Sequence, residues 1–97
     1  MSTQKEIEAG IQTKKVAEVQ QEALELFTRK QLSYGSGNIS AFGTQGVVIR
    51  LNDKVQRLVN MVFNNVDNQV LDEAIEDTFI DICNYGAIGV LTERKHW

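Results

Sequence analysis

The chain has 97 residues, of which 42% are hydrophobic and 24% are charged, and thirteen acidic against ten basic side chains give it a net charge of −3. This length predicts a single domain over residues 1–97, and the acidic balance excludes broad binding to DNA or RNA through counterion release. Because no apolar run approaches the roughly 20 residues of a transmembrane helix and no secretory signal is visible, we expect a cytoplasmic protein without a membrane partner.

The first expected element is an amphipathic helix from about Glu6 to Gln31. Its apolar residues recur at helical spacing, at Val16, Val19, Ala23 and Leu26 with Phe27. Its polar face carries Glu18, Glu22, Glu25 and Arg29. We interpret this face as solvated, with an ion pair between Glu25 and Arg29, and keep metal binding by the glutamates as the less favoured alternative.

A long glycine-rich loop is expected next, because SYGSGNISAFGTQG, residues 33–46, holds four of the seven glycines. The apolar stripe of Leu51, Val55, Leu58 and Val62 then predicts a second helix from about Val47 to Phe63, although Val47-Val48-Ile49 favours a strand locally. A turn follows, with Asp67 or Asn68 as a helix cap.

The last expected helix runs from about Val70 to Thr92, and Gly86 and Gly89 predict either close approach by another helix or a late bend. Cys83, the lone cysteine, is expected to be buried beside Ile82. Together these elements predict an all-α fold of about three helices. A chain this short buries a limited share of its surface, so we expect a second copy to complete the bundle.

Two charged stripes are candidates for chemistry. The basic stripe, Arg50, Lys54 and Arg57, borders the apolar seam of the second helix and is either a solvated face or a phosphate site. The acidic stripe, Glu73, Asp77 and Asp81, would repel itself at four-residue spacing unless cations face it. Those cations are either the basic stripe, in an interhelical salt-bridge network, or a magnesium ion.

Three pieces of the chain follow one another between Lys30 and Ile88: KQLSYGSGNI, FGTQGVVIRLNDKVQRL and EAIEDTFIDICNYGAI. In this order they resemble the small phage nucleotide-modification-associated domain. Its pattern is a Tyr-Gly turn, a Phe-Gly step, an Arg-Leu-x-Asp-Lys-x-x-Arg helix and an Asp-Thr-x-x-Asp-x-x-x-Tyr helix. The resemblance implies a phage or prophage protein, in the host cytoplasm, that works on nucleotides. The positions of this sequence that match the family pattern are Tyr34, Gly35, Phe42, Gly43, Arg50, Asp53, Lys54, Arg57, Asp77, Asp81 and Tyr85.

More distantly, the chain is similar to all-helical nucleotide pyrophosphohydrolases, which hold magnesium with Glu-Glu-x-x-Glu and Glu-x-x-Asp motifs. It departs from them, because Glu22-x-x-Glu25 is only part of the first motif and Glu73-x-x-Glu76 stands in place of the second. Nucleotide binding is therefore the main expectation, with magnesium-dependent hydrolysis as its enzymatic version.

In the expected site, the glycine-rich loop holds phosphate with backbone N–H groups, Tyr34 or Phe42 stacks on a base, and Asn38 bonds the base edge. The alternative is a structural loop whose glycines let it cross tightly over the bundle, with Tyr34, Ile39 and Phe42 as apolar anchors. The expected ligand-binding residues are Tyr34, Gly35, Gly37, Asn38, Phe42, Arg50, Lys54 and Arg57. The expected magnesium ligands are Asp53, Asp77 and Asp81. Two alternatives are a noncatalytic sponge that sequesters a host nucleotide signal of immunity, and an assembly factor whose charged stripes hold subunits together.

Overall fold

A computed structural model describes residues 1–64 and 71–97 of the chain. Its helices are α1 (Gln4–Tyr34), α2 (Gly37–Val62) and α3 (Leu71–Glu93), and no strand occurs in these two ranges. The predicted all-α class with three helices is confirmed, and Val47-Val48-Ile49 is helical. The proposed caps Asp67 and Asn68 lie outside the described residues. Within those residues we find no helix with the length and apolarity needed to cross a bilayer.

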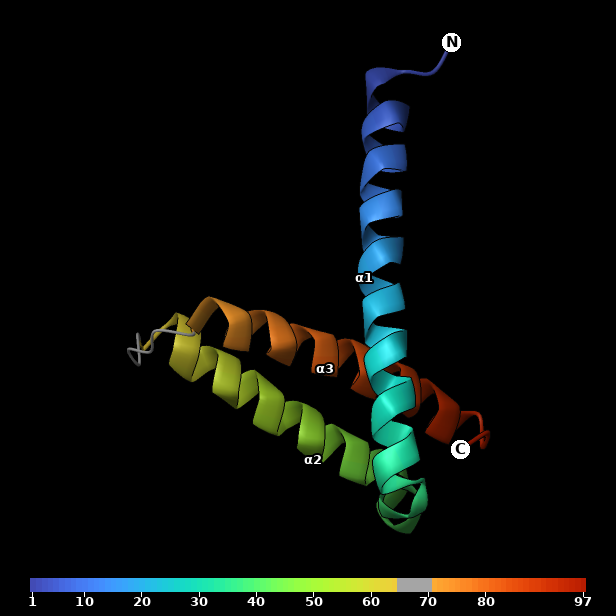
Figure 1. Cartoon of the computed structure of the whole chain (residues 1–97), viewed down its shortest axis with the longest axis vertical. Coiled ribbons are helices and arrows are strands. Elements are labelled where there is room, and N and C mark those ends of the chain that lie inside the picture. Colours follow the sequence, from blue (N-terminus) through green and yellow to red (C-terminus); the bar gives the residue numbers. More distant parts are fainter. Residues whose placement is uncertain (65–70) are drawn as a thin grey trace.

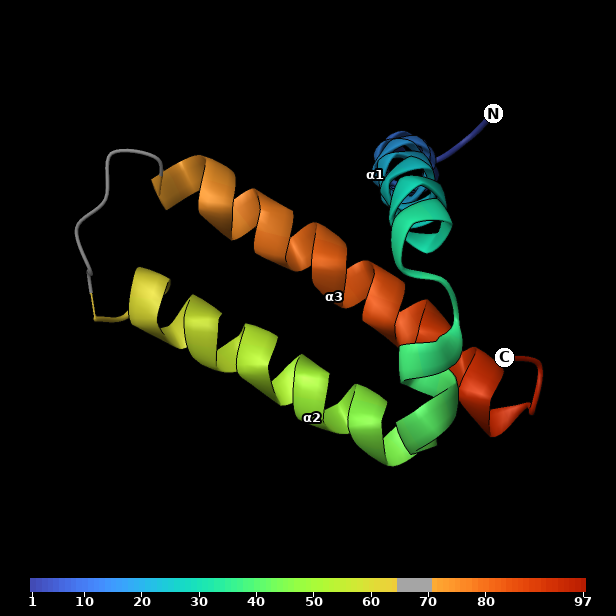
Figure 2. The ribbon, with the colours of Figure 1, turned by 60° about the horizontal axis from the view of Figure 1, so that its bottom comes forward.

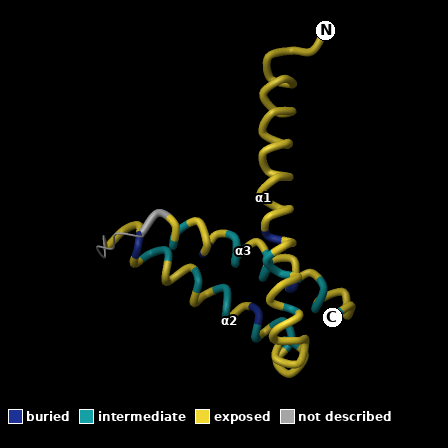
Figure 3. The backbone as a smooth tube through the Cα atoms, in the orientation of Figure 1, coloured by how far each residue is buried: buried dark blue, intermediate teal, exposed yellow. Residues whose placement is uncertain are grey.

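The helices α2 and α3 form an antiparallel hairpin, and α1 crosses α3 and projects away from it (Figures 1 and 2). Thr3 caps α1 by accepting a hydrogen bond from the backbone N–H of Glu6 at 3.1 Å, so the helix begins before the expected Glu6. Residues 1–22 are all exposed (Figure 3). The radius of gyration is accordingly 16.3 Å, whereas a compact chain of this length has about 12.5 Å.

The core lies where α3 meets its two neighbours. Its buried apolar side chains are Ala23 from α1, Val47 and Met61 from α2, and Ile88 from α3. A Cβ atom added to Gly89 would stand 3.5 Å from Val47 Cγ1, so the predicted close helix approach is confirmed at Gly89. At Gly86 the same added atom would meet nothing within 4 Å, so that glycine faces open space.

The predicted long glycine-rich loop is wrong over most of its length. Helix α1 continues to Tyr34 and α2 begins at Gly37, so only Gly35 and Ser36 separate them. Two glycines with positive φ make the change of direction: Gly35 at φ 70°, and Gly43, which kinks α2 at φ 62° and ψ −151°. Because glycine adopts such angles without a Cβ clash, two of them turn the chain and the other glycines of the segment remain helical.

Two smaller expectations also change. Cys83 is exposed, because residues adjacent in a helix point in directions about 100° apart and an isoleucine neighbour does not bury it. Glu25 accepts a hydrogen bond from Gln21 Nε2 at 3.4 Å, and within the described residues no ion pair joins it to Arg29.

Candidate functional site

Asp81 is the point at which all three helices are tied together by charge. Its Oδ1 accepts a hydrogen bond from Lys30 Nζ of α1 at 2.8 Å, and its Oδ2 accepts one from Lys54 Nζ of α2 at 3.0 Å. The Asp81 side chain is only 16% exposed. The salt-bridge interpretation of the acidic stripe is thus confirmed for Lys54 and Asp81, with Lys30 as an additional partner.

The environment of Asp81 keeps its carboxylate charged. Burial pushes the pKa of Asp81 upward, but the hydrogen bonds and positive charges of Lys30 and Lys54 outweigh burial, and the pKa lies below its ordinary value. The two lysines and Asp81 together carry one net positive charge at neutral pH. This cluster is therefore locally basic in a chain that is acidic as a whole.

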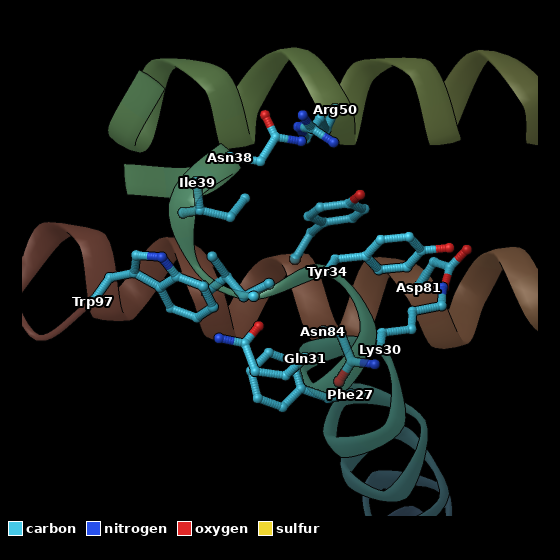
Figure 4. A pocket seen from close by; sticks show the side chains of 13 residues that line it. Phe27, Lys30, Gln31, Tyr34, Asn38, Ile39, Arg50, Asp81, Asn84 and Trp97 are labelled. Atoms are coloured by element: carbon cyan, nitrogen blue, oxygen red, sulfur yellow. The ribbon is translucent and has the colours of Figure 1, made fainter. Parts of the chain in front are cut away.

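A pocket of about 410 Å³ opens beside this cluster, where the end of α1, the start of α2 and the second half of α3 meet. Its polar and charged lining comes from Lys30, Gln31, Asn38, Arg50, Asp81 and Asn84. Its aromatic lining comes from Phe27, Tyr34, Tyr85 and Trp97. Figure 4 shows Arg50 and Asn38 on the α2 side of the pocket and Lys30, Asp81 and Phe27 across from them. The volume falls within the range of about 300–1,000 Å³ that small-molecule sites occupy.

Trp97 forms one wall of the pocket. Its ring lies edge-on to Phe27, with 6.0 Å between ring centroids and 72° between ring planes. Its indole Nε1 donates a hydrogen bond to the backbone oxygen of Ser36 at 3.1 Å, in the break between α1 and α2. Asn84, on another side, donates to the backbone oxygen of Ala23 at 2.9 Å and fixes α3 against α1. These contacts hold the aromatic and amide walls in place.

Arg50 differs from the two lysines in its partners. It is partly buried and lines the pocket, but no ion pair or side-chain hydrogen bond joins it to any residue that the structure describes. Among the residues that line the pocket, Lys30 and Arg50 are cations and Asp81 is an anion, so the charged lining carries a net charge of +1. A half-buried cation without a counter-charge favours an anionic ligand.

The structure brings together part of the predicted ligand site. Tyr34, Gly35, Asn38 and Arg50 line the pocket, and Lys54 reaches it indirectly through Asp81. The other predicted residues, Gly37, Phe42 and Arg57, are exposed and outside the pocket lining. The Gly35 backbone N–H donates to Gln31 O at 2.9 Å, so it is used as the cap of α1 and does not serve an anion-binding nest.

The predicted magnesium ligands are not gathered into one group. Asp81 binds the two lysines, whereas Asp53 and Asp77 are exposed. Across residues 1–64 and 71–97, no three His, Cys, Asp or Glu side chains are placed to hold a metal ion. The residues that the structure describes do not fit a magnesium site.

Lys30, Phe27, Gln31 and Trp97 belong to the pocket but were absent from the predicted site. Lys30 and Asp81 are 51 positions apart in sequence, so local spacing carries no signal of their pairing. Phe27 was recognised only as part of the apolar stripe of α1. The helix crossing that turns this stripe into a pocket wall is a tertiary feature.

No protein-family model, curated protein or solved structure matches the chain.

Proposed function

We propose that the protein binds a small anionic ligand with an aromatic group, and that a nucleotide or nucleotide-derived molecule is the ligand class. The observation that carries the proposal is Arg50, a partly buried cation that lines an aromatic pocket and has no ion-pair partner among the described residues. A guanidinium group binds phosphate oxygens with two parallel hydrogen bonds, and aromatic rings stack on a base.

The charged and the aromatic lining of the pocket each suit a different part of the proposed ligand. Arg50 and Lys30 offer positive charge, which suits a phosphate group. Phe27, Tyr34, Tyr85 and Trp97 offer ring faces and edges, which suit a base. Three amide side chains, Gln31, Asn38 and Asn84, supply hydrogen-bond donors and acceptors for the edge of a base or for a sugar. The resemblance to the phage nucleotide-modification-associated domain points to the same class of ligand.

Binding without chemical change is the version that we favour. A magnesium-dependent pyrophosphohydrolase needs several carboxylates that hold the metal and activate a water molecule, and Asp81 has both oxygens occupied by lysines. A noncatalytic sponge for a nucleotide signal needs only the pocket. We further propose that the protein acts as a homo-oligomer in the cytoplasm, inside the host cell where the source is a phage.

The test identifies which small molecules the protein binds and whether it releases them chemically unchanged. Native protein is purified, denatured, and the released small molecules are identified by mass spectrometry; apo protein is then incubated with nucleotide mixtures in magnesium or in EDTA. We expect a phosphorylated ligand, bound equally well in EDTA and recovered intact. A product with fewer phosphates would support the hydrolase, and the absence of any bound phosphorylated compound would contradict the proposed function.

A further inference from the structure

The α2–α3 hairpin has two faces, and α1 with the pocket covers only one of them. Helix α3 meets α1 through Asn84, Ile88 and Leu91, which line the groove between these two helices. Two residues along a helix correspond to a rotation of roughly 200°. Ile82 and Gly86 therefore point away from α1, on the opposite side of α3 from Asn84 and Ile88.

The same face includes a stripe of α2. Lys54 and Asp81 bond to each other between the helices, and the next residues along the chain, Val55 and Ile82, are each rotated by roughly 100° in the same sense about their helix axes. The two helices are antiparallel (Figure 2), and helix geometry therefore brings both side chains to one face of the hairpin. Leu51, Leu58 and Val62 continue the stripe on α2, and Ile75, Phe79 and Gly86 continue it on α3.

This face, which we call the outer apolar face, carries no charged residue between Ile75 and Gly86 of α3 or along its stripe on α2, and Glu93, seven positions after Gly86 on the same side of α3, marks its end. Its members are Leu51, Val55, Leu58 and Val62 of α2, and Ile75, Phe79, Ile82 and Gly86 of α3. Several of them are strongly exposed in the single chain: Val55 is 45%, Val62 47% and Phe79 53% exposed. A continuous uncharged patch of this kind marks a surface that another protein covers.

We propose that a second copy of this chain covers the outer apolar face, so that two α2–α3 hairpins pack face to face into a four-helix bundle. This inference specifies the surface of the proposed homo-oligomer and is independent of ligand binding. In a two-fold symmetric pair a surface patch meets its own copy. A patch without charge suits this arrangement, because any charge near the axis would meet a like charge.

The chain exposes more surface than a compact monomer of its mass. A folded monomer of 10.9 kDa exposes about 5,600 Å² on average, whereas this chain exposes 7621 Å². Residues 1–22, which are all exposed, contribute part of this excess of about 2,000 Å², and the exposed side chains of the outer apolar face contribute another part.

Gly86 supports the same arrangement. It lies inside α3, where a glycine is less favourable for the helix than alanine. Nothing lies within 4 Å of the Cβ position of Gly86. A glycine on an apolar helix face leaves room for a facing helix, and the hairpin itself does not use that room. The pocket lies on the opposite side of the hairpin, so the paired form leaves it open.

Molar mass in solution tests the proposal, measured by sedimentation equilibrium or by size exclusion with light scattering. Wild type is expected at twice the 10.9 kDa of one chain. The double variant Val55→Glu, Phe79→Glu is expected at the mass of one chain with its helical circular dichroism retained. The matched control is Ile11→Glu, which places the same charge at a side chain that is 51% exposed on the projecting part of α1, and it is expected to keep the mass of two chains.

If the double variant loses its helicity, a milder variant still tests the proposal. Phe79→Ala removes an aromatic side chain without adding charge, and we expect it to raise the dimer dissociation constant by at least about tenfold. A wild-type mass of one chain would overturn the proposal. So would a folded double variant that remains dimeric, or a dissociation constant that Phe79→Ala leaves unchanged.

Discussion

Lys54 Nζ lies 3.0 Å from Asp81 Oδ2 and joins the middle of α2 to the middle of α3. Since Lys30 binds the other oxygen of the same carboxylate, Asp81 connects all three helices. This one cluster positions the pocket, because Lys30 and Asp81 are also part of its lining. Substitutions of Asp81 should therefore lower the stability of the fold even when no ligand is bound.

We predict that Asp81→Asn lowers the free energy of unfolding by about 1–3 kcal/mol, the usual range for hydrogen bonds to a charged group. The substitution keeps the shape of the side chain but leaves two ammonium groups without their carboxylate. Urea unfolding followed by circular dichroism measures the change. Asp77→Asn, at an exposed position of the same helix, is the matched control and should stay within about 0.5 kcal/mol of wild type. Equal losses in the two variants would contradict the role of Asp81.

The pH dependence of the free energy of unfolding should also reveal the contribution of the Asp81 carboxylate. The pKa of Asp81 is lowered in the folded chain, so its stabilising contribution is complete above the pKa of about 3.9 that an unfolded aspartate has. That contribution is lost as the pH falls through the still lower pKa of the folded state. In urea titrations from about pH 7 to pH 2, the difference between wild type and Asp81→Asn should be constant down to about pH 4 and then shrink. A difference that shrinks between pH 7 and pH 5 would be inconsistent with the lowered pKa.

Gly43 and Gly10 should respond in opposite directions to alanine. At φ 62° and ψ −151°, Gly43 holds a conformation that side chains rarely adopt, and Gly43→Ala should destabilise the fold by about 1–3 kcal/mol. Gly10 is an exposed helical residue with nothing within 4 Å of its Cβ position, so Gly10→Ala should stabilise α1 by up to about 1 kcal/mol. Thermal unfolding of both variants gives the two signs. If Gly43→Ala leaves the unfolding temperature unchanged, the kink tolerates a side chain and the prediction is wrong.

The helices were predictable because their apolar residues repeat at three- and four-residue intervals. Leu51, Val55 and Leu58 correctly outweighed the local strand preference of Val47-Val48-Ile49. The extent of the glycine-rich loop was not predictable in the same way. Glycine and serine are typical of loops, but whether each glycine turns the chain or continues a helix depends on its φ angle, and among the described glycines only Gly35 and Gly43 have positive φ.

The candidate site was predictable only where its residues are neighbours along one element. Tyr34, Gly35 and Asn38 come from one short segment, and Arg50 follows on α2. Lys30 and Trp97 join them through the crossing of α1 over α3 and the contact of Trp97 with Phe27. Those contacts depend on how helices pack, which a periodic pattern does not specify.

The most direct test of the proposed function uses Trp97, the single tryptophan of the chain, because it lines the pocket next to Phe27. Its fluorescence is titrated with nucleoside mono-, di- and triphosphates and cyclic nucleotides in EDTA, in wild type, Arg50→Ala and Arg57→Ala. We predict a saturable change with at least one of these ligands, a dissociation constant about 10- to 150-fold higher in Arg50→Ala, and one within about twofold of wild type in Arg57→Ala, whose arginine is outside the pocket. No response to any nucleotide, or equal weakening in both arginine variants, would contradict the account.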